Sequence, residues 1–172
     1  MPPEFVDIRE ATEADALAML DIYRPYVENT AISFEMEVPS RDEYQARVRK
    51  YIEGWACVVA ETDGQVVGYA YGSSHRERRA YQWSVETTVY VAPACHRSGI
   101  GRKLYGALLP KLADAGFCNA YAGTTLPNPA SVGLHLAVGF KPVGTFARVG
   151  RKFNRWHDVA WLHKVLREEP IS

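Results

Sequence analysis

A glycine-rich turn joins a strand to a helix between residues 89 and 105, and this segment constrains the fold more than any other. The strand-forming run Val89–Val91 is ended by Pro93, and Gly99 and Gly101 then open a helix. This helix carries leucines at helical spacing, at positions 104, 108, 109 and 112. Glycines let the backbone turn sharply, and the first N–H groups of a helix have no intrahelical partner. The segment therefore predicts a phosphate or pyrophosphate site within an α/β fold.

Three kinds of phosphate-binding loop compete for this turn. A Walker loop needs four residues between its glycines and then Lys-Ser or Lys-Thr, which the segment lacks. A Rossmann fingerprint needs a third glycine, and Leu104 occupies that place. The third kind is the pyrophosphate loop of acetyl-CoA-dependent N-acetyltransferases, Gln/Arg-x-x-Gly-x-Gly/Ala, in which His96 here replaces the Gln or Arg. Alone, the turn favours a ligand site only modestly over an ordinary strand–turn–helix link with a glycine cap.

Length and composition exclude several classes of protein. A chain of 172 residues that is 47% hydrophobic can bury one sizeable core, which predicts a single domain over residues 1–172. The formal net charge of zero argues against nucleic acid or an anionic membrane as the main partner. No apolar run approaches the about 18 residues of a membrane span, and the start MPPEFVDIRE is unlike a signal peptide. Three cysteines without a CxxC pair predict reduced thiols in a cytoplasmic protein, and the five histidines lack metal-ligand spacing.

Hydrophobic periodicity and turn signals predict the element order β-α-α-β-β-β-α-β-α-β-β. The expected strands cover residues 6–9, 57–61, 66–72, 83–91, 119–125, 141–147 and 158–165. The expected helices run from a Thr12 cap through Val27, and over residues 41–53, 99–115 and 130–138, with residues 30–34 extended or in a loop. Asp63-Gly64 predicts a tight hairpin turn. This order predicts one α/β domain with a mixed sheet.

A carboxylate interrupts the strand that leads into the glycine turn. Glu86 lies in YQWSVETTVYV, where glutamate is unfavourable and a buried charge is costly unless it is paired. Alternation along the strand places Glu86 on the same face as Thr88 and Tyr90, and opposite to Thr87 and Val89. Burial would raise the pKa of Glu86 from about 4.3 toward neutrality and suit it to act as a general base. A solvent-facing or salt-bridged glutamate is an equally good interpretation of its position alone.

A histidine on the expected last helix is a second candidate. His135 lies in NPASVGLHLAVGF, and its neighbours at helical spacing, Ser131, Val132 and Val138, are small or apolar, so its imidazole is expected to face inward. A lone inward histidine is more often a hydrogen-bonded core residue than a catalytic one. Its ordinary pKa near 6.5 is nevertheless suited to proton transfer around neutral pH.

The chain resembles the GNAT superfamily of N-acetyltransferases over nearly its whole length, from IREATEAD at residues 8–15 to HDV at 157–159. Within it, AYQWSVETTVYVAP, HRSGIGRKLY, LPNPASVGLHLAVGF and VGRKFNRWHDV resemble the phosphinothricin acetyltransferase family, including its methionine sulfone and methionine sulfoximine acetylating members. The resemblance implies a single-domain GNAT fold, with a splayed mixed central sheet flanked by helices. Acetyl-CoA would lie where two neighbouring parallel strands diverge, and the protein would be a homodimer.

The resemblance also implies a role for each site residue. Glu86 and His135 would be catalytic, with His135 at the place from which a tyrosine protonates the CoA thiolate in many GNAT enzymes. The residues expected to bind acetyl-CoA are Val89, Tyr90, Val91, Arg97, Ser98, Gly99, Ile100, Gly101, Arg102 and Asn128. The residues expected to bind the acceptor are Phe34, Arg76, Glu86, Thr87 and Thr88, with Arg76 favoured over Arg78 and Arg79. No metal is implied.

The expected reaction is acetyl transfer from acetyl-CoA to the primary α-amine of a small amino-acid-like acceptor. The acceptor would be of the phosphinothricin type, a herbicide, or of the methionine sulfoximine or sulfone type, and would attack directly in a ternary complex. One alternative is another amine, such as a polyamine, an antibiotic or a protein N-terminus, although an arginine-rich acceptor loop suits cations poorly. The other is a non-catalytic acyl-CoA-binding module, against which the presence of both Glu86 and His135 argues.

Overall fold

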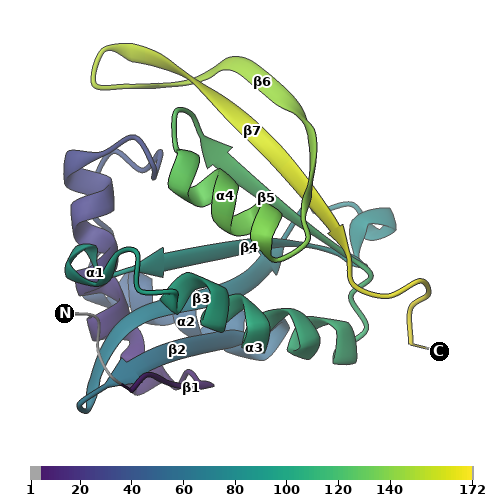
Figure 1. Ribbon diagram of the computed structural model, residues 1–172, viewed down its shortest axis with the longest axis horizontal. Helices are drawn as coiled ribbons and strands as arrows, with labels where there is room; N and C mark the ends of the chain where they lie inside the picture. Colours follow the sequence, from purple (N-terminus) through teal and green to yellow (C-terminus); the bar gives the residue numbers. More distant parts are fainter. Residues whose placement is uncertain (1–4, 172) are drawn as a thin grey trace.

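A seven-stranded mixed sheet in the order β1-β2-β3-β4-β5-β7-β6 forms the centre of the fold (Figure 1). The computed structural model describes residues 5–171; the first four residues of the N-terminal segment and Ser172 lie outside this part. The strands are β1 (Asp7–Glu10), β2 (Cys57–Thr62), β3 (Gln65–Ser74), β4 (Ser84–Val91), β5 (Asn119–Thr125), β6 (Lys141–Lys152) and β7 (Arg155–Val165). The α-helices are α1 (Ala16–Asn29), α2 (Arg41–Gly54), α3 (Ile100–Asp114) and α4 (Pro129–Ala137). The predicted α/β class and element order are confirmed.

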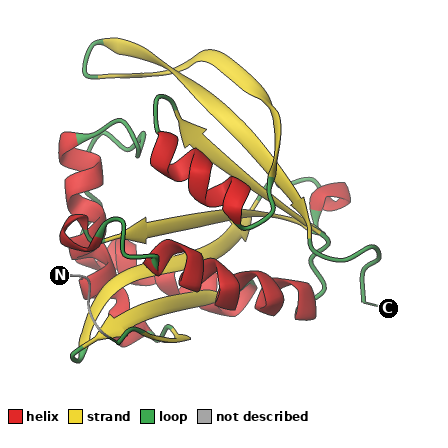
Figure 2. Cartoon of the chain, in the orientation of Figure 1, coloured by secondary structure: helices red, strands yellow, loops and turns green. Residues whose placement is uncertain are grey.

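The last hairpin is longer than the sequence predicted. The expected strand over residues 141–147 continues to Lys152, and its partner begins at Arg155 instead of residue 158. The pairing shifts register between Phe146 and Gly150, and the turn is made by Phe153 and Asn154, both with positive φ. The Phe153-Asn154 turn lacks the glycine that usually marks a two-residue hairpin turn. The hairpin extends well beyond the rest of the sheet in Figures 1 and 2.

Helices cover both faces of the sheet and create two hydrophobic cores (Figure 2). The face bearing α3 and α4 buries leucines of α3 against Val85 of β4 and Ala120 of β5. The face bearing α1 and α2 buries Met19 and Val48 against Val59 and a group of tyrosines. Successive residues of β4 therefore point into different cores. None of the helices within the described residues is long and apolar enough to cross a membrane.

The central strands β4 and β5 separate after a short paired stretch. They are the one parallel pair in the sheet, and their register covers only Ser84↔Asn119, Val85↔Ala120 and Glu86↔Tyr121. Beyond Glu86 and Tyr121, β4 runs on to Val91 and β5 to Thr125 without pairing to each other, so the two strands diverge as Figure 1 shows. The splayed sheet predicted from the family resemblance is confirmed. Backbone groups along this opening have lost their usual partners in the sheet.

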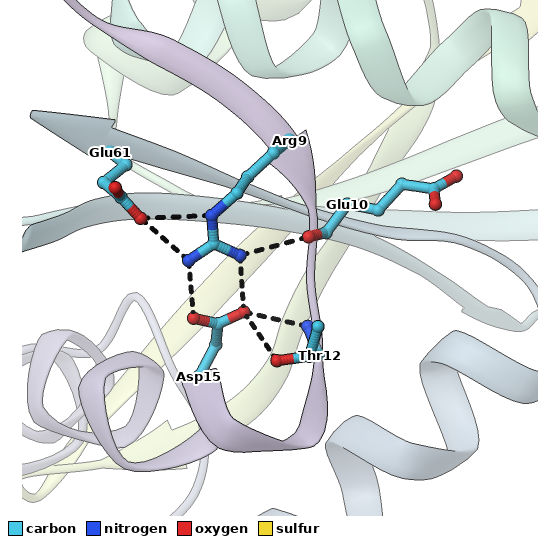
Figure 3. A network of polar contacts seen from close by, with 5 residues as sticks. All are labelled: Arg9, Glu10, Thr12, Asp15 and Glu61. Atoms are coloured by element: carbon cyan, nitrogen blue, oxygen red, sulfur yellow. Dashed lines mark hydrogen bonds and ion pairs between the residues drawn. The ribbon is translucent and has the colours of Figure 1, made fainter. Parts of the chain in front are cut away.

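An ion-pair network joins the first strand to the start of α1 (Figure 3). Arg9 of β1 forms two hydrogen bonds of 2.8 Å with Asp15 and also contacts Glu61 of β2 at 2.8 Å. Asp15 in turn accepts from the Thr12 N–H at 2.8 Å, which completes a capping box before α1. Hydrogen bonding by Arg9 lowers the pKa of Asp15 below its ordinary 3.8. The network fixes the entry of α1 at the sheet edge far from the opening between β4 and β5.

Candidate active site

A cavity of about 110 Å³ lies in the opening between β4 and β5. Thr87 to Tyr90 of β4 form one wall, and Gly123 to Thr125 of β5 form the other. Asn128, Ser131 and His135 line it from α4 and the preceding loop, and Ile32 lines it from the loop after α1. The strand that carries the predicted general base Glu86 and the predicted histidine His135 therefore line one cavity.

Backbone groups of alternate β4 residues face this opening. Ala92 N–H donates to Val67 of β3 at 2.8 Å, and the β3–β4 register then continues without a shift to Val85. In an antiparallel pair, hydrogen-bonded and non-hydrogen-bonded positions alternate. Tyr90 is therefore bonded to Tyr69 of β3, whereas Val89 and Val91 direct their N–H and C=O groups toward β5. Of the three residues expected to bind acetyl-CoA through the backbone, Val89 and Val91 are placed to do so and Tyr90 is not.

The glycine turn leaves several N–H groups available at the start of α3. Arg97 and Gly99 have φ of +61° and +77°, so the chain turns through two left-handed residues just before Ile100. Lys103 N–H is bonded to the Gly99 carbonyl at 3.1 Å, which makes it the first donor of the helical ladder. The N–H groups of Ile100, Gly101 and Arg102 therefore precede the ladder and are unpaired within the helix. With the positive end of the helix dipole and the exposed Arg97, they suit a pyrophosphate.

Within this turn, Ile100 and Gly101 contribute to packing, Ile100 by its side chain and Gly101 by the absence of one. Ile100 is fully buried in the core under α3. A Cβ on Gly101 would lie 2.9 Å from the Leu134 side chain, so glycine allows α3 and α4 to approach closely here. Both residues can bind a ligand only through their backbone. Ser98 is similarly engaged, because its hydroxyl donates to the Cys95 carbonyl.

The unusual His96 is bound to α1. Its Nε2 lies 2.7 Å from the Tyr26 hydroxyl and 3.3 Å from the Val91 carbonyl. The Tyr26 hydroxyl also donates to the Val91 carbonyl, so this backbone acceptor of β4 is already occupied. His96 thus connects the glycine turn to α1 and the end of β4, a role that the loop pattern did not indicate.

Glu86 projects from β4 where the strands begin to separate. Its side chain is 29% exposed, and no hydrogen bond to it is formed by any of the described residues 5–171. Burial raises the pKa of Glu86 above its ordinary 4.5, and the positive charge of Arg76 opposes part of that rise. The Glu86 carboxylate is therefore half-buried and free of hydrogen bonds from residues 5–171, and its pKa is shifted toward the range of a general base.

His135 lies on the other face of the sheet within a closed hydrogen-bond chain. Its Nδ1 is 2.7 Å from the Ser131 carbonyl, which can only accept, so Nδ1 carries the proton. Nε2 then accepts from the Tyr105 hydroxyl at 2.7 Å, and Thr87 lies 3.0 Å behind Tyr105. Burial lowers the pKa of His135 below 6.5, which keeps the ring neutral at pH 7. The Ser131 hydroxyl, 3.4 Å from Nδ1, lines the cavity.

The expected acceptor residues divide between the two faces of the sheet. Thr88 shares the face of Glu86, whereas Thr87 is buried on the other face and directs its hydroxyl to Tyr105. Arg76 is exposed, and its charge acts on Glu86. Phe34 packs against Gly150 and lies 6.2 Å from the His157 ring, while Ile32 of the same loop lines the cavity. The side chain of Thr87 therefore contacts Tyr105, and that of Phe34 contacts the β6–β7 hairpin, instead of Glu86.

Asn128 starts α4 and also lines the cavity. Its Oδ1 accepts from the Ser131 N–H at 3.1 Å as the helix cap, which leaves its amide nitrogen for a ligand. The cap also fixes Ser131, whose hydroxyl lies 3.1 Å from Thr124 of β5. Among residues 5–171, no cluster of three or more His, Cys, Asp or Glu side chains could hold a metal ion.

A buried lysine attaches the long hairpin to the loop beside the cavity. Lys152, 3% exposed, donates from Nζ to the Val27 carbonyl at 2.6 Å and to the Ser33 carbonyl at 2.8 Å. These two acceptors lie at the end of α1 and next to Ile32. This contact could not be predicted from the sequence, because a lysine near a hairpin turn usually faces solvent.

We expect Lys152→Met to lower the free energy of unfolding by about 1–3 kcal/mol, because two buried carbonyls lose a charged donor. Urea unfolding at pH 7 measures the change. Lys141→Met, at the exposed start of the same strand, is the matched control and should change stability little. Equal stability of the two variants would show that the Lys152 contacts do not hold the hairpin to the loop.

Comparison with known proteins gives a consistent family. The sequence model of a family described as an acetyltransferase (GNAT) domain matches residues 8–161. Phosphinothricin N-acetyltransferase from Streptomyces coelicolor is 41% identical over 165 residues, covering 94% of this chain and 96% of that protein. An L-methionine sulfoximine/L-methionine sulfone acetyltransferase from Salmonella typhimurium is 34% identical, covering 94% and 95%.

The solved structures agree with these relatives. The crystal structure of a GNAT superfamily phosphinothricin acetyltransferase from Sinorhizobium meliloti, in complex with acetyl-CoA, matches with a TM-score of 0.92 and 32% identity. That match covers 96% of this chain and 93% of the other. The resemblance to phosphinothricin and methionine sulfoximine acetyltransferases, expected from the sequence, is confirmed. Sequence, fold and comparisons together show that the chain belongs to the GNAT family of acetyl-CoA-dependent N-acetyltransferases.

Proposed function

We propose that this enzyme acetylates the primary α-amine of a small amino-acid-like acceptor, with acetyl-CoA bound in the opening between β4 and β5. The observation that carries the proposal is the position of Glu86. Its uncommitted, half-buried carboxylate lies at the point where β4 leaves β5, next to backbone groups that face the cavity. A base and a row of backbone donors at one opening suit acyl transfer to an amine.

In this proposal the cofactor follows the splayed edge of β4. The pyrophosphate is bound by the N–H groups that open α3, together with Arg97 and Arg102. The pantetheine is bound by backbone groups of Val89 and Val91 and by the Asn128 amide. The thioester carbonyl accepts from the Val89 N–H, because Val89 lies beyond the last β4–β5 pair, lines the cavity and directs its backbone groups toward the opening. Developing negative charge on that oxygen is stabilised by the same donor.

Proton transfer in this proposal uses one group from each face of the sheet. Glu86 removes a proton from the acceptor ammonium, and the neutral amine then attacks the thioester carbon. His135 supplies the proton taken by the CoA thiolate, through the Ser131 hydroxyl that lines the cavity. The attacking nitrogen loses its second proton as the tetrahedral intermediate collapses, and this proton returns through the Ser131 hydroxyl to His135, so the ring ends the reaction neutral. The Tyr105 hydroxyl, 2.7 Å from Nε2, holds the ring in the orientation that this route needs.

The proposed acceptors are phosphinothricin and the sulfone and sulfoximine of L-methionine. Relatives at 41% and 34% identity carry these names. Such acceptors present a carboxylate, and we assign its partner as Arg76, an exposed residue whose charge acts on Glu86. A second candidate acceptor class is not favoured by any contact at the site.

A thiol-release assay with acetyl-CoA tests the proposal. We expect CoA release with phosphinothricin, L-methionine sulfone or L-methionine sulfoximine, and little release with spermidine, an aminoglycoside or a peptide with a free N-terminus. Preference for one of the latter amines would replace the proposed acceptor class. Tight acetyl-CoA binding without release for any amine would instead favour an acyl-CoA-binding module.

A homodimer is part of the proposal. The exposed large apolar side chains of the β6–β7 hairpin support it: Val143, Phe146, Val149, Phe153 and Trp156 are each at least half exposed. Exposed apolar side chains gathered on one projecting element are typical of a protein interface. Light scattering on the eluted protein is expected to give twice the 19.3 kDa chain mass.

A further inference from the structure

His75 lies beside Glu86 and has no role in the reaction described above. Ser73 of β3 is the direct partner of Glu86 in the sheet, and His75 follows two residues later, just beyond the end of β3 at Ser74. The chain there brings the His75 ring next to the Glu86 side chain. Its Nδ1 lies 3.7 Å from Glu86 Oε1.

The His75 ring is fixed in place by aromatic contacts. It stacks on Tyr121 of β5, with centroids 4.9 Å apart and planes 18° apart, and its edge meets Tyr81 at 5.8 Å. Trp161 of β7 lies 6.4 Å away in a perpendicular arrangement. Contacts on several sides leave the ring little freedom, so Nδ1 is directed consistently toward the carboxylate.

Two polar atoms in this aromatic group are buried without a partner. Among the described residues, His75 Nδ1 and Trp161 Nε1 are the buried side-chain nitrogens or oxygens that lack any hydrogen bond. Buried polar atoms in folded proteins are nearly always paired, and exceptions often mark groups that act during function. The Glu86 carboxylate lies 3.7 Å from His75 Nδ1.

From this geometry we propose that His75 is the proton-accepting partner of Glu86. The inference rests on the proposed function, in which Glu86 takes a proton from the acceptor ammonium. An N–H bond of the ammonium breaks as the Glu86 O–H bond forms, and that proton then passes to His75 Nδ1. The resulting imidazolium releases a proton to solvent from Nε2, and after product release proton exchange with solvent returns the ring to its Nε2–H tautomer for the next turnover. His75 acts through Glu86 and does not itself contact the acceptor nitrogen.

Two features of the site make this transfer useful. A bound acceptor would cover the exposed part of Glu86, so its proton needs another exit, and the His75 side chain is 15% exposed. Burial also brings the pKa values of the two groups closer together, since it raises the pKa of Glu86 and lowers the pKa of His75. Proton sharing is most effective between groups of similar pKa. The 3.7 Å separation is expected to shorten in the ternary complex, as is common for such contacts.

The other charged and titratable groups around His75 are few. Arg76 is adjacent in the chain and lowers the pKa of His75 by repulsion. Tyr81 and Tyr121 contact the ring, and His163 stacks on Tyr121 at 4.7 Å from its far side. His163 is bonded to Asn119 at 2.8 Å, so it is a histidine of the same stack that faces away from Glu86.

The kinetic test compares three substitutions of His75 with one control, using acetyl-CoA and L-methionine sulfone or phosphinothricin. We expect His75→Phe, which keeps the stacked ring, to lower kcat by about tenfold or more, since a positioned proton-transfer group contributes about 10²–10⁴. His75→Asn should be as slow, because an amide can hydrogen-bond to Glu86 but cannot take its proton. Added imidazole should partly restore the rate of His75→Ala.

The matched control is His163→Phe, which removes a histidine from the same stack and should keep the kcat and pH profile of the wild type. A wild-type kcat for His75→Phe would overturn the inference. So would full activity of His75→Asn, which would reduce the role of His75 to a hydrogen bond.

A second readout does not depend on turnover. In NMR titrations of ¹⁵N-labelled histidine, the midpoint of His75 should fall in Glu86→Gln, because the imidazolium loses a neighbouring carboxylate. An unchanged midpoint would overturn the pairing whether or not the enzyme is active. Failure of the wild type to release CoA with any amine would instead refute the proposed function, so the two failures are distinguishable.

Discussion

Glu86→Gln is expected to lower kcat/KM by about 10²–10⁴ at pH 7, the usual contribution of a positioned general base. Glutamine has nearly the size and shape of glutamate but cannot accept the ammonium proton. Since no hydrogen bond from the described residues reaches Glu86, the change leaves no partner unpaired. The fold and the cofactor site should therefore survive, and acetyl-CoA affinity by calorimetry should match the wild type.

The pH profile gives this prediction a direction. The base works only when ionised, so kcat/KM should rise with pH through the pKa of Glu86 and then level off. Burial has raised that pKa above 4.5, so the rise should occur at higher pH than for an exposed glutamate. Glu86→Gln should lose this rise as well as the rate. Near-wild-type kcat/KM with intact acetyl-CoA binding would show that Glu86 is not the base.

Glu61→Gln is the matched control. Glu61 is also a strand glutamate that is partly exposed, but it belongs to the Arg9 network shown in Figure 3. Its strand β2 is separated from β4 by β3. The same chemical change there should affect stability slightly and leave kcat/KM unchanged. A rate loss in both variants would indicate a general effect on the fold.

Local sequence signals predicted the order of elements because each signal acts over a few residues. The Asp63-Gly64 turn, the Ser40 cap and the glycine turn before α3 all lie where they were expected. The splay of β4 and β5 is not local, and it entered through the family resemblance. The hairpin end was predicted too early, because Arg148, Phe153 and Asn154 adopt positive φ without glycine.

The candidate site was predicted where a residue was unusual for its element. Glutamate in a strand and histidine on an apolar helix face are conspicuous, whereas Tyr105 among the leucines of α3 reads as ordinary core. His75 lies in an irregular segment, and its proximity to Glu86 depends on the register Ser73↔Glu86, which sequence does not give. Alternation placed Thr87 on the face opposite to Glu86, and the structure agrees, because the Thr87 hydroxyl lies 3.0 Å from the Tyr105 hydroxyl.

Replacing the Val89 N–H by an ester oxygen is expected to lower kcat by about 10²–10³, the usual cost of losing one oxyanion donor. The ester is made by incorporating the α-hydroxy acid that carries the same side chain as valine, so the side chain at position 89 stays the same. Because Val89 directs its backbone groups away from β3, the change removes no bond of the β3–β4 ladder. Stability should therefore change little, while the thioester oxygen loses its donor.

The same replacement at Tyr90 is the matched control, since Val89 and Tyr90 are adjacent on β4 and direct their N–H groups to opposite sides. Tyr90 N–H belongs to the ladder with Tyr69, so the ester there should lower the free energy of unfolding by about 0.5–1.5 kcal/mol. Its kcat should remain close to that of the wild type. The two esters thus separate a donor used by the reaction from one used by the sheet. Equal losses of kcat in both, or a large loss of stability at Val89 alone, would contradict the assignment of Val89 as the oxyanion donor. A clean separation would show that the splay of β4 from β5 is what frees a strand N–H for chemistry.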